Sequence, residues 1–241
     1  MPATPLTPAD LDRIPAPTGP PNRAGLIGEV STVLQPGRLL LKSPRLRSAP
    51  RGDGRIALFL PGWKAPDVST LPIRGYLGRL GHDARSWGLG VNQGDVEAKR
   101  DEMIGIVERL AESSGRPVNL VGWSLGGVVS REIARNTPDA VHRVVTYGTP
   151  VVGGPTHTAG ASTYAESELA RIRALQEHLD ATDPIATPIT AIFTRNDSAV
   201  DWRACIDRSS TAVTMIEVGS THVGLGIDPD VWLVVANALA E

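Results

Sequence analysis

The segment with the clearest chemistry is residues 122–126, which read Gly-Trp-Ser-Leu-Gly and match the pattern G-x-S-x-G around Ser124. A turn of this kind presents a serine hydroxyl between a strand and a helix, where it can attack an acyl carbon. The flanking glycines are needed because side chains there would clash with the strand and the helix. The bare pattern arises by chance in roughly one chain in ten, so an ordinary glycine-rich turn is the alternative.

The context of Ser124 favours a nucleophile, because an apolar run precedes it and a helix-forming segment follows it. Apolar runs predict buried strands at 56–60, 82–87, 118–122, 141–147, 190–194 and 213–218. Apolar residues at helical spacing predict helices at 68–80, 96–112 and 228–240, and another from the Ser124 turn to about Arg135. This alternation indicates an α/β fold with a mostly parallel central sheet flanked by helices.

The chain is predicted to divide at about residue 53. Residues 1–53 are expected to form an N-terminal extended arm and a short helix, and residues 54–241 the α/β domain. The arm covers the first twenty-two residues, where prolines remove amide donors and fix φ. The short helix is expected between residues 24 and 41, with a break at Pro36-Gly37, and a polar linker follows from Ser43 to Gly54.

One connection is long for a compact domain. Residues of about 152–187 separate two predicted strands, and only 165–179 has helical character. Long connections in compact domains are usually functional. We therefore expect a small lid here.

Five segments together resemble the α/β-hydrolase family, and within it the bacterial lipase-like and esterase-like members. They are residues 58–63 (Leu-Phe-Leu-Pro-Gly-Trp), 87–92, 122–127, 197–200 and 219–222. These segments span the chain from about residue 54 to its end, whereas the first fifty residues are only loosely covered. The resemblance implies the α/β-hydrolase fold and a serine, an acid and a histidine in that order along the chain.

The resemblance implies Ser124 as nucleophile, Asp197 as acid and His222 as base. Asp197 follows strand 190–194 and fits the family's Asp-x-x-Val pattern, with Asp201 as a competitor and Asp207 as a more distant one. His222 lies after the last strand, at the end of a strand where open α/β sheets keep their sites. The other histidines after Ser124 begin a strand or lie in the lid: His142, His157 and His178.

The same resemblance implies an oxyanion hole made of two backbone amides. One is the N–H of Leu125, directly after the nucleophile, and the other is the N–H of Trp63, which Gly62 helps to aim. Apolar residues near these groups are expected to form an acyl pocket, although core packing is the alternative for the tryptophans. The predicted pocket residues are Trp123, Trp202, Val200 and Val223.

These residues predict a serine hydrolase that cleaves carboxylic esters with short to medium apolar acyl chains through an acyl-enzyme intermediate. An acyltransferase or a lipase on the same scaffold is one alternative. A non-catalytic binding protein with the same fold is the other, although such proteins typically lose a member of the triad. Fold alone does not choose between them.

Composition excludes several other classes. The 24 Lys and Arg against 26 Asp and Glu give no basic excess for nucleic acid. No apolar stretch is long enough for stable membrane insertion, and no metal-ligand or phosphate-loop spacing predicts a metal or cofactor. A single cysteine, Cys205, excludes an intramolecular disulfide, and no secretory pattern begins the chain, so a cytoplasmic protein is expected. The expected partner is a small-molecule ester, and the oligomeric state is left open.

Overall fold

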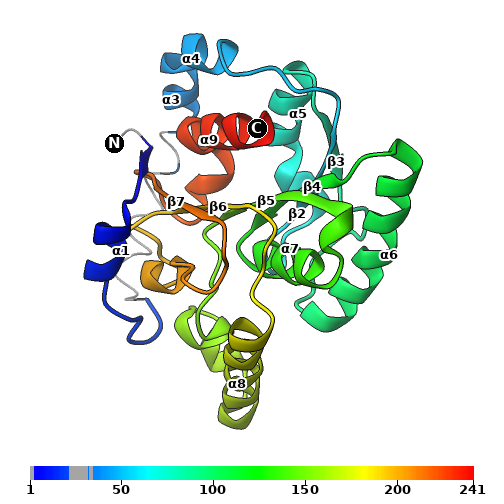
Figure 1. Cartoon of the computed structure of the whole chain (residues 1–241). Helices are drawn as coiled ribbons and strands as arrows, with labels where there is room; N and C mark the ends of the chain where they lie inside the picture. The colour runs from blue at the N-terminus through cyan, green and yellow to red at the C-terminus, as the bar shows by residue number, and fades with distance from the viewer. Residues whose placement is uncertain (1–2, 22–31, 33–34) are drawn as a thin grey trace.

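The computed structural model describes residues 3–21, 32 and 35–241, and it contains a central sheet with helices on both faces (Figure 1). The strand order is β1-β7-β6-β5-β4-β2-β3, and every neighbouring pair is parallel except β1 with β7. The predicted α/β architecture is thereby confirmed. The strands are β1 Thr4–Pro5, β2 Ile56–Leu60, β3 Asp83–Ser86, β4 Val118–Trp123, β5 Val141–Tyr147, β6 Ile189–Phe193 and β7 Val213–Glu217.

Helices cover the two faces of the sheet in separate groups (Figure 1). One face carries α6 and α7, and the other carries α4, α5 and α9. The helices are α1 Pro8–Arg13, α3 Gln35–Leu41, α4 Ser43–Arg47, α5 Leu71–Arg79, α6 Val96–Ser114, α7 Leu125–Asn136, α8 Glu166–Thr182 and α9 Pro229–Leu239. Short 3-10 turns include η2 Asp67–Thr70, η4 Gly154–His157, η6 Trp202–Cys205 and η7 Gly224–Ile227.

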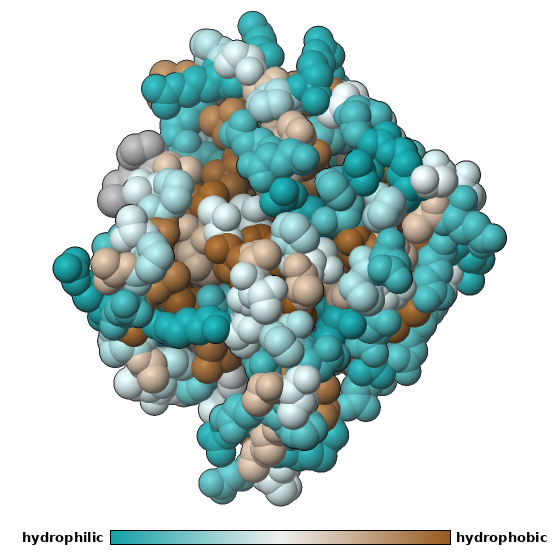
Figure 2. Space-filling view, in the orientation of Figure 1, coloured by the Kyte–Doolittle hydropathy of each residue, from teal (hydrophilic) through white to brown (hydrophobic). Residues whose placement is uncertain are grey.

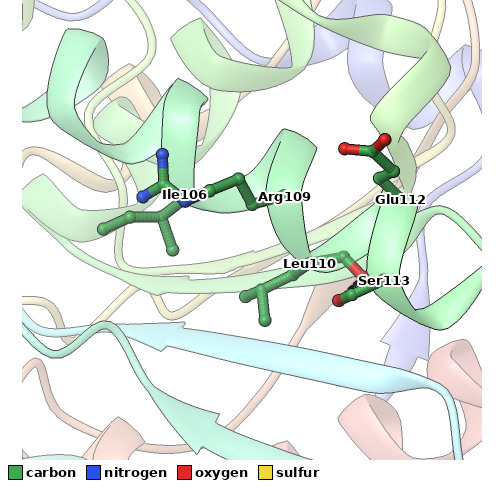
Figure 3. Close-up of a pocket in the computed structure, with 5 residues that line it drawn as sticks. All are labelled: Ile106, Arg109, Leu110, Glu112 and Ser113. Atoms are coloured by element: carbon green, nitrogen blue, oxygen red, sulfur yellow. Dashed lines mark hydrogen bonds between the residues drawn. The ribbon is translucent and has the colours of Figure 1, made fainter.

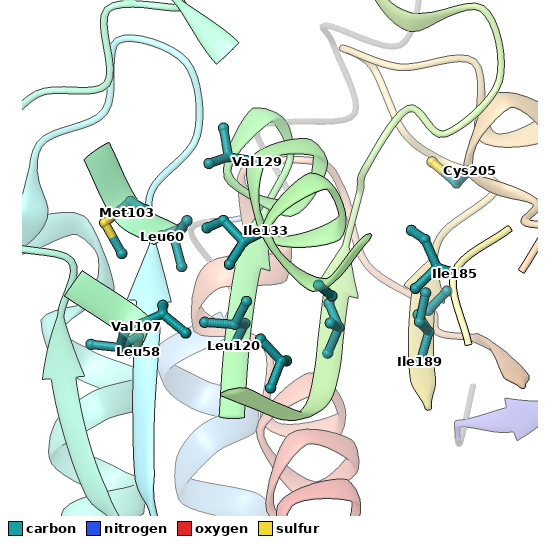
Figure 4. Packing of buried hydrophobic residues seen from close by; sticks show 14 of the residues in the cluster. Leu58, Leu60, Met103, Val107, Leu120, Val129, Ile133, Ile185, Ile189 and Cys205 are labelled. Carbon is teal, nitrogen blue, oxygen red and sulfur yellow. The ribbon is translucent and has the colours of Figure 1, made fainter. Parts of the chain in front are cut away.

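Strand β2 shows how the sheet is buried on both faces. Its five residues are all apolar and all buried, and successive side chains of a strand point to opposite faces. Leu58 and Leu60 pack with Met103 of α6 and Ile133 of α7, as Figure 4 shows. Phe59 packs into the other cluster, against α5 and α9. The sheet is therefore held between two apolar layers, which fixes the ends of its strands.

The N-terminal region differs from the expected extended arm. Residues 8–13 form helix α1, because Thr7 caps it through a reciprocal hydrogen-bond pair with Asp10 and Pro8 occupies its first turn. Residues 4–5 pair with β7 at the edge of the sheet. The expected helix at 24–41 lies largely outside the described residues.

The expected break and the expected linker are also corrected. Helix α3 runs through Pro36-Gly37, and Ser43–Arg47 is helical as α4. In both cases a proline lies in the first turn, where its missing N–H costs no intrahelical hydrogen bond. The sequence analysis instead placed Pro36 at a break in the pattern and Pro44 in a polar linker.

Helix α8 lies in the connection that was expected to form a lid. It projects from the body of the molecule in Figure 1, and none of its residues is buried. Arg135 of α7 holds its C-terminal end through Asp180 and the carbonyl group of Leu179.

Hydrophilic side chains dominate the periphery of the face in Figure 2, whereas apolar ones gather nearer its middle. Within the residues that the structure describes, no helix combines the length and the apolar character needed to cross a bilayer.

Candidate active site

Ser124 occupies a strained turn between β4 and α7. Its φ of 52° and ψ of −120° lie outside the regions that non-glycine residues normally adopt. In the described part of the chain, Lys64 is the other non-glycine residue with positive φ, and it lies in the loop after β2. Strain of this kind persists only where the surrounding structure enforces it, and it is concentrated at functional sites.

The glycines around Ser124 are required by close backbone contacts. A Cβ on Gly126 would lie 2.2 Å from the carbonyl oxygen of Leu60, and one on Gly122 would lie 2.4 Å from the Cα of Gly127. A Cβ on Gly127 would lie 2.0 Å from the hydroxyl oxygen of Thr149. The turn therefore packs directly against β2 and against the segment after β5, with no room for side chains.

His222 and Asp197 form a buried pair. Nδ1 of His222 lies 2.8 Å from Oδ2 of Asp197, and the two residues are 6% and 8% exposed. The other carboxylate oxygen of Asp197 accepts the backbone N–H groups of Ala199 and Val200 at 2.9 and 2.7 Å. The loop after β6 thus fixes the carboxylate in the direction of the imidazole.

The two competing aspartates have other partners. Asp201 caps η6 by accepting the N–H of Arg203 at 3.0 Å, and its other oxygen accepts the N–H of Thr18 at 3.4 Å. Asp207 is paired with buried Arg131 and accepts the N–H of Ser210. Burial raises the pKa of Asp207, but Arg131 and the hydrogen bonds outweigh it and leave that pKa below its usual value. The structure therefore brings Asp197, and neither competitor, into contact with His222.

Ser124 and His222 both lie against the carboxyl end of β5. The N–H of Ser124 donates to the carbonyl oxygen of Tyr147 at 2.9 Å. The next residue, Gly148, has a φ of 60°, and a Cβ there would lie 3.1 Å from Nδ1 and Cε1 of His222. The ring of Trp123 is also tilted against the imidazole, with centroids 5.9 Å apart. The predicted nucleophile and base therefore lie around the same short stretch of backbone.

Gly148 was missed by the sequence analysis. In the sequence it is only a glycine directly after a buried strand, and that pattern is too common to predict a site residue. Its role becomes visible from the ring of His222, which lies against it.

The loop after β2 lies against the Ser124 turn. A Cβ on Gly62 would be 3.4 Å from the Cβ of Ser124. Trp63 is the next residue of that loop. Asn92, which is fully buried, holds the loop from behind. Its side-chain amide donates to the carbonyl oxygen of Pro61 at 2.9 Å, and its backbone carbonyl accepts the N–H of Lys64 at 2.7 Å.

Asn92 is a second residue that the sequence analysis gave no role. It closes the 87–92 segment that contributed to the family resemblance, which was the available signal.

Leu125 begins α7, and the first N–H groups of a helix have no acceptor within the helix. Its amide therefore adds to the positive end of the helix dipole beside Ser124.

The four predicted pocket residues lie in different environments. Trp123 is half-buried beside His222, and Val223 is 52% exposed directly after it. Val200 is buried in the core layer, and Trp202 stacks on Phe193 with ring centroids 5.8 Å apart. The structure brings Trp123 and Val223 close to the imidazole. The contacts of Val200 and Trp202 instead support the loop of Asp197.

The remaining histidines have no contact with Asp197 in the described structure. His142 lies near the start of β5, His157 closes η4 and His178 is exposed on α8. Cys205 is buried, and burial, together with the charges of Asp197 and Asp201, raises the pKa of its thiol well above the ordinary value. A thiol in that state is a poor nucleophile.

Figure 3 shows a depression that is separate from this site. Its lining residues all belong to α6: Ile106, Arg109, Leu110, Glu112 and Ser113. None of them was predicted as a site residue.

Several solved structures share the fold of this chain. The chain is similar in structure to Aspergillus fumigatus lipase B, with a TM-score of 0.59, 18% identity, and coverage of 81% of this chain but 57% of the lipase. It is also similar to one of two metagenome-derived lipolytic enzymes, with a TM-score of 0.59, 16% identity, and coverage of 80% and 94%. A third similar structure is the type II thioesterase BorB of the borrelidin biosynthetic cluster, with a TM-score of 0.54, 18% identity, and coverage of 80% and 94%. At these identities the likeness concerns the fold. Residues 57–239 match the model of the alpha/beta hydrolase family, and the chain belongs to that family.

Proposed function

We propose that this protein is a serine hydrolase that cleaves carboxylic esters with short to medium apolar acyl chains through an acyl-enzyme intermediate. One arrangement carries the proposal. Ser124 lies in a positive-φ turn at the end of β4, against the carboxyl end of β5. The imidazole of His222 lies against the same end of β5, and its Nδ1 contacts a buried carboxylate. A serine hydroxyl needs a base of this kind, held in one tautomer, to become a nucleophile.

In the first half of the reaction, Nδ1–H of His222 donates to Asp197, which leaves Nε2 free of its proton and able to accept one. Nε2 takes the hydroxyl proton of Ser124 as the serine oxygen attacks the ester carbonyl carbon. The resulting oxyanion accepts hydrogen bonds from the amides of Leu125 and Trp63. Nε2 then gives its proton to the alcohol oxygen, the carbon–oxygen bond breaks, and the acyl group stays on Ser124.

In the second half, a water molecule takes the place of the alcohol. His222 removes one proton from the water as its oxygen attacks the acyl carbon, and the same two amides stabilise the second oxyanion. Return of the proton to Ser124 releases the carboxylic acid. The carboxylate of Asp197 stabilises the imidazolium that forms in each step.

The surroundings of the site support an apolar acyl group. The side chain of Trp63, whose amide is a proposed oxyanion donor, is 41% exposed, and Val223, directly after His222, is 52% exposed. Exposed apolar residues at a reactive centre offer surface that an acyl chain can cover, which stabilises binding by about 25 cal/mol per Å² of buried area.

The rate of ester hydrolysis by the Ser124→Ala variant tests the proposal. With p-nitrophenyl butyrate, we expect kcat to fall by a factor on the order of 10⁴ to 10⁶, because the covalent route is removed. A fluorophosphonate probe should label the wild-type protein on Ser124, as mass spectrometry can locate. The matched control is Ser130→Ala, because Ser130 lies in the same helix and its hydroxyl donates to the carbonyl oxygen of Gly126.

Two outcomes would contradict the proposal: full activity in a folded Ser124→Ala protein, or labelling at another residue. Added alcohol separates hydrolysis from acyl transfer. A hydrolase releases mainly the free acid, whereas an acyltransferase would form mainly the new ester.

A further inference from the structure

One side chain of the N-terminal region joins the two ends of the segment that carries His222. Nη1 of Arg38, in α3, donates to the carbonyl oxygen of Gly219 at 3.3 Å and to Oδ2 of Asp228 at 2.5 Å. Gly219 precedes His222 and Asp228 follows it, at the start of α9. A single guanidinium group thus spans the loop at its base, and Figure 1 shows α3 beside α9.

Burial makes the loss of this contact costly. Asp228 has no exposed surface, and its other carboxylate oxygen caps α9 by accepting the N–H of Asp230 at 2.8 Å. The Nη2 atom of Arg38 reaches Asp230 at 2.9 Å, which completes a forked contact to two carboxylates. Removing the partner of a buried charge is strongly destabilising, so the buried carboxylate of Asp228 depends on Arg38 at this position. A planar guanidinium can make these contacts together, whereas an ammonium group acts as a single point charge.

Other contacts restrain the same loop between its ends. The hydroxyl oxygens of Thr32 and Thr221 lie 2.9 Å apart, so a second residue of the N-terminal region contacts the residue directly before His222. The carbonyl oxygen of Ser220 accepts the hydroxyl of Thr194, at the end of β6, at 2.7 Å. Thr194 also leads into the loop of Asp197, so the acid loop and the base loop are joined by a hydrogen bond beside the His222–Asp197 contact.

Arg38 and Thr32 both lie outside the part of the chain that matches the family model, which begins at residue 57. The N-terminal region therefore adds contacts to the base loop that the matched domain does not itself supply. These contacts act on a group whose position matters, because a misplacement of about 1 Å can cost about 10²-fold in rate.

We propose that Arg38 is a positioning residue for His222: its guanidinium group sets the base loop so that the imidazole meets Asp197 and Ser124 together. This inference rests on the proposed function, since it assigns His222 the role of base. The contacts of Arg38 on this loop include the carbonyl group of Gly219 and the carboxylate of Asp228, so its effect reaches the reaction through these two residues.

Three variants test the inference: Arg38→Ala, Arg38→Lys and Lys42→Ala. Lys42 is the matched control, because its ammonium group binds the same Asp230 at 2.5 Å but neither Gly219 nor Asp228. We expect Arg38→Ala to lower kcat on p-nitrophenyl butyrate by about 10- to 100-fold with KM within about twofold. Arg38→Lys should recover part of kcat, added methylguanidine should raise the kcat of Arg38→Ala, and Lys42→Ala should stay within about twofold of wild type.

A second readout does not depend on substrate. The low-field proton resonance of the Nδ1–H of His222 should shift or broaden in Arg38→Ala and stay in place in Lys42→Ala. The inference is overturned if Arg38→Ala loses no more kcat than Lys42→Ala and the resonance is unchanged, while wild type remains an active, Ser124-dependent esterase. If wild type hydrolyses no ester, the proposed function fails, and an unchanged resonance in Arg38→Ala would then reject the positioning role separately.

Discussion

The carboxylate of Asp197 lies 2.8 Å from Nδ1 of His222, although 25 positions separate the two residues in the chain. Their strands, β6 and β7, are neighbours and parallel, so the loops that follow them leave the same edge of the sheet. The hydrogen bond between Thr194 and Ser220 joins these loops a few residues earlier. The pair is thus a consequence of strand order, and the loops need little length to form it.

This geometry predicts that Asp197→Asn damages ester hydrolysis far more than Asp201→Asn does. An amide at position 197 no longer holds the imidazole in the required tautomer, and the loss of such an acid costs up to about 10⁴ in kcat. In the Asp201→Asn variant, the side-chain amide oxygen can still cap η6, so kcat should change little. Steady-state kinetics of the two folded variants provides the check, and a crippled Asp201→Asn beside a normal Asp197→Asn would reassign the acid.

The glycines of the Ser124 turn give a prediction about stability. In Gly126→Ala the new methyl group would meet backbone atoms of Leu60 and Pro61, which have no freedom to move aside. Overpacking typically costs 1–3 kcal/mol, and a clash with backbone should reach about 3 kcal/mol or more. Gly75→Ala is the control: it lies in α5 with open space around it, and it should stabilise the protein by about 0.5–1 kcal/mol.

Urea unfolding measures both glycine variants. The steric account of the turn would be contradicted if Gly126→Ala unfolded at the wild-type urea concentration with the wild-type slope.

Much of the fold was readable from the sequence because its strands are buried on both faces. A run such as residues 56–60 is apolar throughout, and the glycines and prolines that bound it mark the ends of the strand. The Ser124 turn was readable for a similar reason, since its glycines are imposed by contacts within one strand-turn-helix unit. Local patterns of this kind predict local structure well.

The N-terminal region was less readable, because proline has two opposite uses. Pro8 and Pro44 lie in the first turns of helices, where a local pattern dominated by proline suggests extended chain instead. The contacts of Arg38 were not readable at all, since they depend on where α3 lies relative to residues about 190 positions away. Contacts between distant side chains leave no period or spacing in a single sequence.

His82 gives a prediction about pH. Its side chain is buried, neither ring nitrogen has a hydrogen-bond partner in the described structure, and burial lowers its pKa below the ordinary value, with Asp53 opposing the shift weakly. The unfolded chain takes up this proton near pH 6.5, whereas the folded protein resists it. The unfolded state therefore binds more protons below about pH 6.5, so the free energy of unfolding should fall as the pH is lowered through that range.

The variant His82→Leu isolates this contribution. It removes the titrating ring, so its free energy of unfolding should depend less steeply on pH between about 7.5 and 5.5, by up to about 1.4 kcal/mol per pH unit for one proton. Burial also lowers the pKa of His142 and His157, so a smaller slope should remain. Equal slopes in wild type and variant would show that His82 accepts its proton without cost in the folded state.

The last prediction concerns acyl chain length. Each methylene that finds apolar surface adds about 0.8 kcal/mol, or about fourfold in kcat/KM, so the optimum along a p-nitrophenyl ester series marks the end of the pocket. We expect this optimum at short to medium chains, because two bulky rings lie near the reactive centre: Trp63 in the loop against the Ser124 turn, and Trp123 beside the imidazole.

Trp63→Ala tests the cause of that limit. The side chain of Trp63 is 41% exposed, so its removal should cost little stability, and its backbone N–H remains available to the oxyanion. We expect the optimum to move to longer esters in this variant, whereas Val68→Ala, which removes another exposed apolar side chain, should leave it in place. The series must be measured below micelle formation, because aggregated substrate would mimic a preference for long chains. A steady rise of kcat/KM to long chains in the wild-type protein would reject the short pocket and favour a lipase, and an unmoved optimum in Trp63→Ala would place the end of the pocket at other residues.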